Sequence, residues 1–295
     1  MKRSIVSLAA SACLIALLGS AGPARAATAT YVSGTGTDAG NCGDPAAPCR
    51  QISAALFQTD PYGTVHVLPG SYDGFDITSA VDIVAAPGTA TVLSGGAQAI
   101  AIAANRVRIM GLTLDGFSGV IVTQPDSVIL SLEDCSIIYG AAAAAMGFDF
   151  RTTGGASTLS LIRTNFIRTE YTNASNAVRI QPTGAASVKA VFDEVHVNRA
   201  PSGGILIDGR FTTGSNSLTI RNSAIAGGDG FGAAVYDSGT GVSTLTIDGS
   251  TIADNATFGV VASGSNATAR LVDSVVSGRA RPDRHVERQH HLAGR

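Results

Sequence analysis

The feature that most constrains the fold of this 295-residue chain is an internal repeat of short apolar runs. The runs LTIRNSAI (218–225) and LTIDGSTI (245–252) share one order, in which a Leu-Thr-Ile run is followed by a polar pair and an isolated Ile. Six such runs align, and the sequence numbers of their successive apolar anchors differ by 29, 31, 28, 27 and 24. The anchors are Leu132, Leu161, Phe192, Ile220, Ile247 and Leu271. No single repeat can bury its own apolar face, so the pattern predicts units that stack into one continuous core.

A second set of apolar runs gives an independent check on this period. The sequence numbers of its anchors differ by 28, 30, 27, 29 and 25, and they drift together with the first set. The second anchors are Val122, Phe150, Ile180, Ile207, Tyr236 and Val261. The two sets therefore define one period, which varies between 24 and 31 in sequence number and holds two or three short strands in each repeat.

This period, without any helical pattern, favours a right-handed parallel β-helix. Leucine-rich repeats have a similar length but need a second leucine ladder, and propeller blades are longer. In a β-helix each strand pairs with its equivalent one coil away, about 4.8 Å along the axis. We predict an all-β fold, a single-stranded right-handed parallel β-helix (solenoid) of roughly eight coils with a short N-terminal capping helix.

The composition agrees with short strands and tight turns. The chain contains 35 Gly and no Trp, and only 14% of its residues are charged, where about 25% is typical. Hydrophobic residues make up 45% of the chain, which is enough for a sizeable core.

The N-terminal segment, 1–26, has the pattern of a secretory signal peptide. Lys2 and Arg3 precede an apolar run from about Ile5 to Leu18, and the segment closes with Ala24-Arg25-Ala26. The run is shorter than the roughly 20 residues that a membrane-spanning helix needs. We expect a protein that is secreted, periplasmic or on the cell surface, with no transmembrane segment after signal removal.

Export sets the redox context of the cysteines. Cys42 and Cys49 lie close together in the sequence, and outside the cytosol this spacing predicts a disulfide within residues 27–62. A metal site would need further Cys or His nearby, so we predict none. Cys135 is left over inside an apolar strand and is expected to be a small core residue.

The charge is distributed unevenly along the chain. Residues 27–278 carry 12 Lys plus Arg against 20 Asp plus Glu, a net charge of about −8. This balance argues against a nucleic-acid partner, which would require a basic face. Residues 279–295 are instead rich in Arg and His and lack the repeat, so we interpret them as an irregular basic tail or as a frameshifted or truncated end.

Three motifs near the N-terminus resemble those of a known family. They are YVSGTGTDAGN (31–41), APCRQISAAL (47–56) and GTVHVLPGSYDGFDI (63–77), and the likeness continues through VRIMGLTLDGF (107–117). The sequence resembles the pectin-lyase-like right-handed β-helix proteins. The resemblance implies an N-terminal strand and a capping helix within residues 27–62, followed by a β-helix over 63–278.

The resemblance says more about the fold than about the reaction. Gln51 replaces the usual helix-starting Thr, and Cys49 stands where an aromatic residue is common. The family includes lyases, hydrolases, epimerases, adhesins and proteins without known activity, so membership does not define an activity.

A column of charged residues follows the first set of anchors. If the coils stack in the predicted register, acidic and basic side chains alternate at about 4.8 Å. The column consists of Glu133/Asp134, Ile162/Arg163, Asp193/Glu194, Arg221/Asn222, Asp248/Gly249 and Val272/Asp273. One interpretation is a solvated ladder that keeps the coils in register. The other is a strip that binds the hydroxyls and uronates of a sugar polymer, with Glu133, Asp134 and Asp248 as candidate ligand-binding residues.

Catalytic candidates within this column are weak. Asp193 and Glu194 could supply the carboxylates of a hydrolase, with Arg163 and Arg221 beside them, but the expected paired-aspartate signature is absent. Lys189 is the only lysine after the signal and could serve as a lyase base, with Ca²⁺ implied only in that case.

We therefore predict a monomer that binds an extracellular polymer, such as a polysaccharide or a cell-surface glycan, without cleaving it. The alternatives are a polysaccharide lyase or glycoside hydrolase that acts through the carboxylate and arginine strip, and an adhesin-like structural fragment. With no Trp and six scattered Tyr, the sequence does not indicate a tight carbohydrate cleft.

Overall fold

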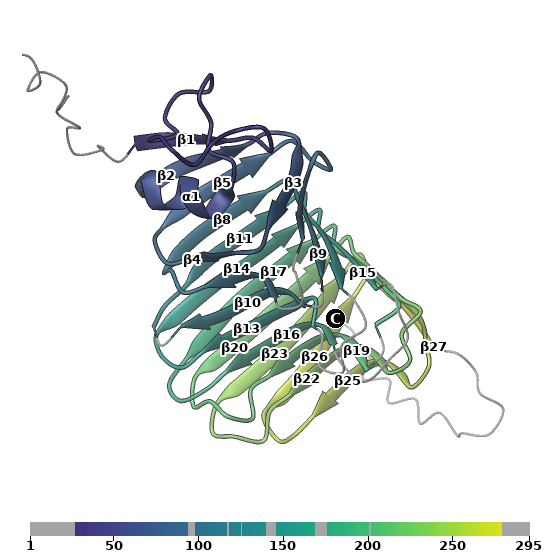
Figure 1. Cartoon of the computed structure of the whole chain (residues 1–295). Coiled ribbons are helices and arrows are strands. Elements are labelled where there is room, and N and C mark those ends of the chain that lie inside the picture. The colour runs from purple at the N-terminus through teal and green to yellow at the C-terminus, as the bar shows by residue number, and fades with distance from the viewer. Residues whose placement is uncertain are drawn as a thin grey trace, which may run out of the picture.

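The chain folds into a parallel β-solenoid (Figure 1). The computed structural model describes residues 27–93, 98–116, 118–124, 126–139, 146–168, 176–200 and 202–278. The predicted signal peptide (1–26) and the predicted basic tail (279–295) lie outside the described residues. Three parallel sheets, named A, B and C, run the length of the solenoid, and each coil visits them in that order.

Sheet A has ten strands. They are β1 (Ala27–Val32), β2 (Thr59–Val67), β5 (Val81–Ala85), β8 (Arg106–Met110), β11 (Ile129–Glu133), β14 (Ala156–Ile162), β17 (Ser187–Asp193), β20 (Ser215–Arg221), β23 (Val242–Asp248) and β26 (Ala267–Val272).

Sheet B has nine strands. They are β3 (Gly70–Asp73), β6 (Ala90–Leu93), β9 (Leu112–Gly116), β12 (Ser136–Tyr139), β15 (Asn165–Arg168), β18 (His196–Asn198), β21 (Ala224–Ala226), β24 (Thr251–Asn255) and β27 (Val275–Gly278).

Sheet C has eight strands, which agrees with the predicted number of roughly eight coils. They are β4 (Phe75–Ile77), β7 (Gln98–Ile102), β10 (Ser118–Gln124), β13 (Phe148–Thr152), β16 (Asn176–Pro182), β19 (Gly203–Asp208), β22 (Phe231–Tyr236) and β25 (Phe258–Ser263).

The strand pairing confirms the first set of anchors at every step. Leu132 pairs with Leu161, and the chain of partners then continues through Phe192, Ile220, Ile247 and Leu271. Because side chains alternate between the two faces of a strand, these residues all point into the solenoid. The first five anchors are completely buried, and only Leu271, in the last coil, is half exposed.

The second set of anchors is correct up to Ile207 and wrong for the last two residues. Ile207 pairs with Val235 rather than Tyr236, and Val235 pairs with Ala262 rather than Val261. Val235 and Tyr236 are adjacent in the sequence and both are apolar, so residue type does not show which of them points into the core. The alternation of the strand decides, because it places Val235 inside with no exposure and Tyr236 on the outer surface.

Sheets A and B meet at a sharp corner that repeats from coil to coil. One residue of each corner has a positive φ, 53° at Asp134, 46° at Arg163, 55° at Glu194 and 51° at Asn222. This left-handed conformation lets the chain change direction abruptly and points these side chains outward. The conformation is unfavourable for most side chains, so it is imposed here by the stacking of the coils.

At Asn222 and at the next two corners, Gly249 and Asp273, the following residue is a serine that ties neighbouring coils together. The Ser223 hydroxyl accepts the backbone N–H of Val195 at 3.0 Å, and the Ser250 and Ser274 hydroxyls accept those of Ser223 and Ser250, each at 3.1 Å. Buried backbone donors that the bend removes from the sheet are satisfied in this way.

Cys135 occupies the equivalent inward position at the corner between β11 and β12, and not the interior of a strand. Its thiol is 1% exposed and donates to the carbonyl of Glu133 at 3.2 Å. Burial raises the pKa of the Cys135 thiol to about 12, so the group stays protonated and unreactive. The prediction of a small core residue is confirmed.

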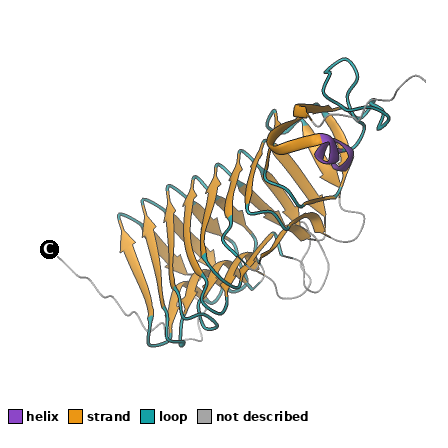
Figure 2. Ribbon diagram, turned by 90° about the vertical axis from the view of Figure 1, so that its left-hand side faces the viewer, coloured by secondary structure: helices purple, strands orange, loops and turns teal. Residues whose placement is uncertain are grey.

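The N-terminal end of the solenoid is covered as predicted (Figure 2). Helix α1 (Ile52–Gln58) buries Ile52 and Ala55, and Cys42 and Cys49 form the predicted disulfide. Gln51 makes no side-chain cap to the helix, and its amide instead exchanges hydrogen bonds with Asp73 of the first coil at 3.1 and 3.2 Å. No helix in the described part of the chain has the length and apolarity needed to cross a bilayer.

Phe192 tests the stacked core. Replacing it by Ala should lower the free energy of unfolding by about 3–5 kcal/mol, because a fully buried ring is lost and a cavity remains. Lys189→Ala, on the outer face of the same strand, should stay within about 0.5 kcal/mol of the wild type. Urea unfolding followed by circular dichroism measures both, and equal losses in the two variants would contradict the predicted register.

Candidate functional site

The predicted charged column exists in the predicted register. Glu133 pairs with Ile162, Ile162 with Asp193, Asp193 with Arg221, and Arg221 with Asp248. Here we name as the corner ladder the residues Glu133, Asp134, Arg163, Asp193, Glu194, Arg221, Asn222 and Asp248. Their positions at the A–B corner follow from the one-residue bend that ends β11, β14, β17, β20 and β23.

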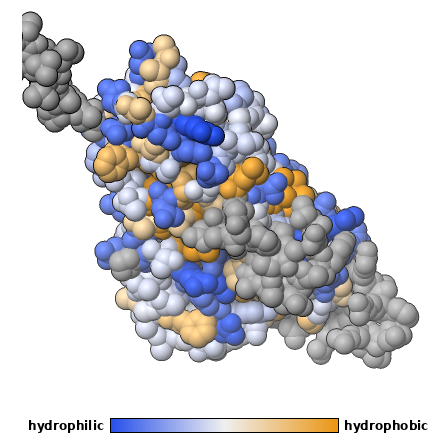
Figure 3. All heavy atoms as spheres, in the orientation of Figure 1, coloured by the Kyte–Doolittle hydropathy of each residue, from blue (hydrophilic) through white to orange (hydrophobic). Residues whose placement is uncertain are grey.

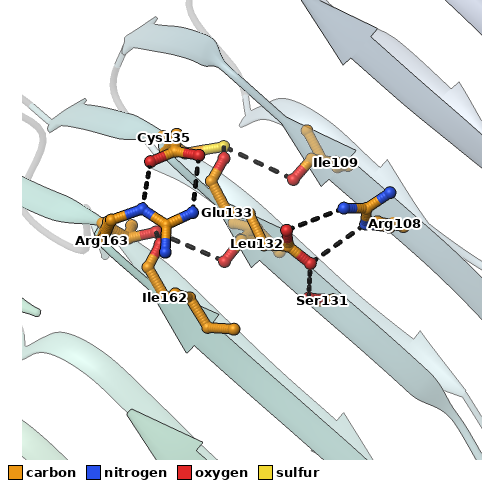
Figure 4. Close-up of polar contacts among 10 residues, drawn as sticks. Arg108, Ile109, Ser131, Leu132, Glu133, Cys135, Ile162 and Arg163 are labelled. Carbon is orange, nitrogen blue, oxygen red and sulfur yellow. Dashed lines mark hydrogen bonds and ion pairs between the residues drawn. The ribbon is translucent and has the colours of Figure 1, made fainter. Parts of the chain in front are cut away.

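Ion pairs between coils hold the first half of the corner ladder together (Figure 4). Arg108 donates to both carboxylate oxygens of Glu133 at 3.0 and 2.8 Å, and the Ser131 hydroxyl adds a third contact at 3.1 Å. Arg163 binds both oxygens of Asp134 at 2.6 and 2.8 Å. Such bidentate pairs fix both partners and leave little carboxylate free for a ligand.

In the second half of the ladder Asp193 is paired, whereas Glu194 and Asp248 form no ion pair among the described residues. Arg221 Nη2 lies 2.8 Å from Asp193 Oδ2, and the Asn222 amide donates to Asp193 Oδ1 at 2.9 Å. Lys189 does not join this group, since it precedes Asp193 by four positions on β17, about 13 Å away at 3.3 Å per residue. The structure thus brings the carboxylates and arginines together and leaves the candidate lysine apart.

The electrostatics of the ladder disfavour proton transfer. The hydrogen bond from Arg108 lowers the pKa of Glu133, and that from Arg163 lowers the pKa of Asp134. Burial raises the pKa of Asp193, but hydrogen bonds from Asn222 and Arg221 outweigh it, and the pKa is lowered overall. A carboxyl general acid at neutral pH needs a pKa shifted upward, and a lowered pKa weakens a carboxylate base, so these groups are better suited to holding coils together.

A second charged group lies on the outward face of sheet C, and the sequence analysis did not identify it. Asp149 of β13 is 2% exposed and receives two hydrogen bonds from Arg179 of β16, at 2.9 and 2.8 Å. Arg151, further along β13 on the same face, pairs with the same carboxylate. One buried carboxylate therefore positions two guanidinium groups.

The next two coils extend this group. Asp208 of β19, also 2% exposed, accepts two hydrogen bonds from Arg210 at 2.7 and 2.8 Å and a third from Gln181 at 3.2 Å. The Arg210 guanidinium lies 5.3 Å from the centre of the Tyr236 ring on β22. We name these residues the sheet C cluster: Asp149, Arg151, Arg179, Gln181, Asp208, Arg210 and Tyr236.

The cluster combines buried carboxylates with accessible guanidiniums. The side chains of Arg151 and Arg210 are 48% and 46% exposed, whereas those of Asp149 and Asp208 are 4% and 3% exposed. Three arginines and two aspartates leave a net charge of +1 in a body whose net charge is about −8. The side of the cluster that faces solvent therefore offers hydrogen-bond donors suited to carboxylates and hydroxyls.

The sequence contains a signal for this cluster. The runs GFDFRTT (147–153), AVRIQPT (177–183) and GILIDGR (204–210) place charged or amide residues between their apolar anchors. Alternation along each strand puts Asp149, Arg179 and Asp208 on the outer face. The outward residues of these runs differ in type from one run to the next, so the apolar period alone does not single them out.

No group of three or more His, Cys, Asp or Glu side chains that could hold a metal ion occurs among the residues that the structure describes. Arginines instead engage Glu133, Asp134 and Asp193 of the corner ladder and Asp149 and Asp208 on sheet C.

Fold and surface together define a β-helix protein with charged residues aligned across successive coils. Residues 92–276 match the family model of the right handed beta helix region, and the chain belongs to this family. A comparison with curated protein sequences finds no match.

Among solved structures, the chain is similar to pectate lyase Pel9A, with a TM-score of 0.59 and 14% identity over 81% of this chain and 68% of that one. It is also similar to a rhamnogalacturonan lyase, with a TM-score of 0.50 and 11% identity over 80% of this chain and 73% of that one. Identities this low show the shared fold alone.

The corner ladder should make stability depend on pH. The pKa of Glu133 is lower in the folded protein than in the unfolded chain, so its contribution is present above the ordinary carboxyl pKa of about 4.3 and is lost as the pH falls through the lower folded value. Glu133→Gln should cost about 0.5–1 kcal/mol at pH 7, and the difference from wild type should shrink between pH 5 and pH 3.

Urea unfolding at several pH values measures this effect. Arg108→Gln is the matched variant, because it removes the guanidinium that lowers the pKa of Glu133. Parallel loss of stability with falling pH in wild type and both variants would show that the pair does not contribute.

Proposed function

We propose that this protein binds an anionic extracellular polysaccharide through the sheet C cluster without cleaving it. The observation that carries the proposal is the pairing of three arginines with two buried carboxylates on one outer face. Arg179 and Arg210 each use Nε and Nη2 for the carboxylate, and among the residues that the structure describes the Nη1 group of each makes no further hydrogen bond and is left for a ligand. An arginine fixed in this way loses little conformational freedom when a carboxylate or hydroxyl binds.

The repeat of the fold suits a repeating ligand. Arg151 pairs with Gln181 on the neighbouring strand, and Asp208 of the strand after that pairs with Tyr236. Strands about 4.8 Å apart present these groups at regular intervals along the solenoid axis. A linear polymer lying along this axis would meet polar groups over several of its units.

The comparisons support a polysaccharide ligand at the level of fold. Two similar structures are a pectate lyase and a rhamnogalacturonan lyase, so this solenoid is used by proteins that act on acidic polysaccharides. The disulfide between Cys42 and Cys49, together with the predicted signal peptide, supports an extracytoplasmic location.

Two alternative functions are less well supported. A lyase or hydrolase acting through Asp193, Glu194, Arg163 and Arg221 would require carboxylates ready to transfer protons, and the lowered pKa of Asp193 argues against this role. A purely adhesin-like structural fragment would not need arginines anchored on buried carboxylates.

Binding to polygalacturonate fragments tests the proposal. Calorimetric titration should detect binding that weakens with added salt, and Arg151→Gln combined with Arg210→Gln should weaken it at least tenfold. The control, Arg163→Gln with Arg221→Gln, removes the same two charges from the corner ladder and should leave the affinity unchanged. Equal loss of affinity in both double variants would refute binding at the sheet C cluster.

Cleavage is tested in the same samples. We expect neither unsaturated ends nor new reducing ends from pectate, alginate or neutral polysaccharides, with or without Ca²⁺. Product that disappears in Asp193→Ala or Glu194→Ala would establish an enzyme and move the active site to the corner ladder.

A further inference from the structure

We infer that the N-terminal end of the solenoid carries a second carbohydrate site, which takes a neutral, hydroxyl-rich sugar. It lies at the turns that join sheet C to sheet A, and it is separate in residues and chemistry from the sheet C cluster. The inference does not depend on the function proposed for that cluster.

The site is a groove of about 570 Å³ across three successive turns. Thr78 lies in the turn between β4 and β5, Asn105 in the turn between β7 and β8, and Asp126 in the turn between β10 and β11. A smaller hollow of about 260 Å³ beside α1 shares Thr78, Ser79 and Ala80 with the groove. The two hollows therefore adjoin along one edge of the solenoid. Figure 3 shows one face of the molecule, coloured by the hydropathy of each residue.

A bulge in β2 places Tyr62 against this groove. Ala27 and Ala29 of β1 pair with Thr59 and Thr64 of β2, so β2 advances by five positions where β1 advances by two. The bulge brings the ring of Tyr62 to the surface, where the residue is 64% exposed and lines the groove. Bulges of this kind commonly re-aim a side chain beside a functional site.

The backbone around Tyr62 is held in an unusual conformation. Tyr62 has φ 67°, a left-handed value that is rare for a bulky side chain, and its N–H donates to the Ala80 carbonyl at 2.7 Å. At the adjacent Gly63 an added Cβ would lie 2.8 Å from the Thr28 carbonyl oxygen, so the turn has no room for a side chain there. An aromatic residue at such a position, exposed and not part of the core, points to a role in binding.

Aromatic and polar groups then combine in the groove. Arg106 lies over the Tyr62 ring at 5.8 Å and is itself fixed by Asp82 at 3.0 Å. Phe57, 86% exposed, lines the adjoining hollow. Exposed rings of this kind pack against the apolar C–H faces of sugars.

Three polar side chains of the groove are available to a ligand. Within the part of the chain that the structure describes, Asn105, Gln124 and Asp126 have no side-chain hydrogen-bond partner. Two amides and a carboxylate can between them donate to and accept from hydroxyl groups. Asp126 in the groove and Asp60 and Asp76 beside the adjoining hollow would repel a uronate, so the chemistry favours a neutral sugar.

Tyr62→Gly tests this inference, because it separates binding from folding. Glycine tolerates a positive φ, so the thermal unfolding midpoint should stay unchanged or rise, whereas affinity should fall at least tenfold. The probes are neutral hexasaccharides from xylan, mannan, galactan and β-glucan, titrated into the purified protein. At least one should bind the wild type.

Two variants serve as controls. Phe258→Ala removes another exposed aromatic residue, at the far end of the solenoid, and should retain full affinity for the neutral sugar. The Arg151→Gln, Arg210→Gln variant should also retain it, so failure at the sheet C cluster can be distinguished from failure here. The inference is overturned if no neutral hexasaccharide binds, if Tyr62→Gly binds like wild type, or if Tyr62→Gly loses stability together with affinity.

Discussion

The structure depends on the parallel pairing of each strand with its equivalent in the next coil. Backbone hydrogen bonds hold neighbouring strands about 4.8 Å apart and place each side chain beside its equivalent one repeat later. Inside, this pairing stacks Leu161, Phe192 and Ile220 into a continuous core. Outside, it brings charges into columns, where a like charge in the next coil would be costly and an opposite charge stabilises the stack.

This constraint separates three surfaces of the molecule. In the corner ladder, arginines of neighbouring coils pair with Glu133, Asp134 and Asp193, and the pKa values of Glu133 and Asp134 are lowered as a result. In the sheet C cluster, buried aspartates carry arginines whose remaining donors face outward. In the groove beside Tyr62, Asn105, Gln124 and Asp126 have no side-chain hydrogen-bond partner within the described residues, and they lie at the turns that join sheet C to sheet A.

Much of the fold and of the charged surface could be predicted where a residue pattern repeats from coil to coil, and little could be predicted where it does not. The corner ladder was predicted residue by residue, since a run that fixes the core position of Leu132 also fixes the outward position of Glu133. The last anchors of the second set were displaced by one position, because Val235 and Tyr236 are both plausible core residues. The sheet C cluster was not predicted, because its members differ in type from coil to coil, although strand alternation places Asp149 and Arg179 on the same outer face.

By itself, the sequence determined the period and the right-handed parallel solenoid expected from it. It also determined the N-terminal cap with its disulfide and the register of the first set of anchors. These follow from apolar spacing, which is local and repeated many times. Only the tertiary structure decided which charges pair and how far each arginine is exposed. It also decided that the side chain of Tyr62 points toward the groove, because of the bulge in β2. Such features depend on contacts between different coils, where a change of one position in register exchanges the inside for the outside.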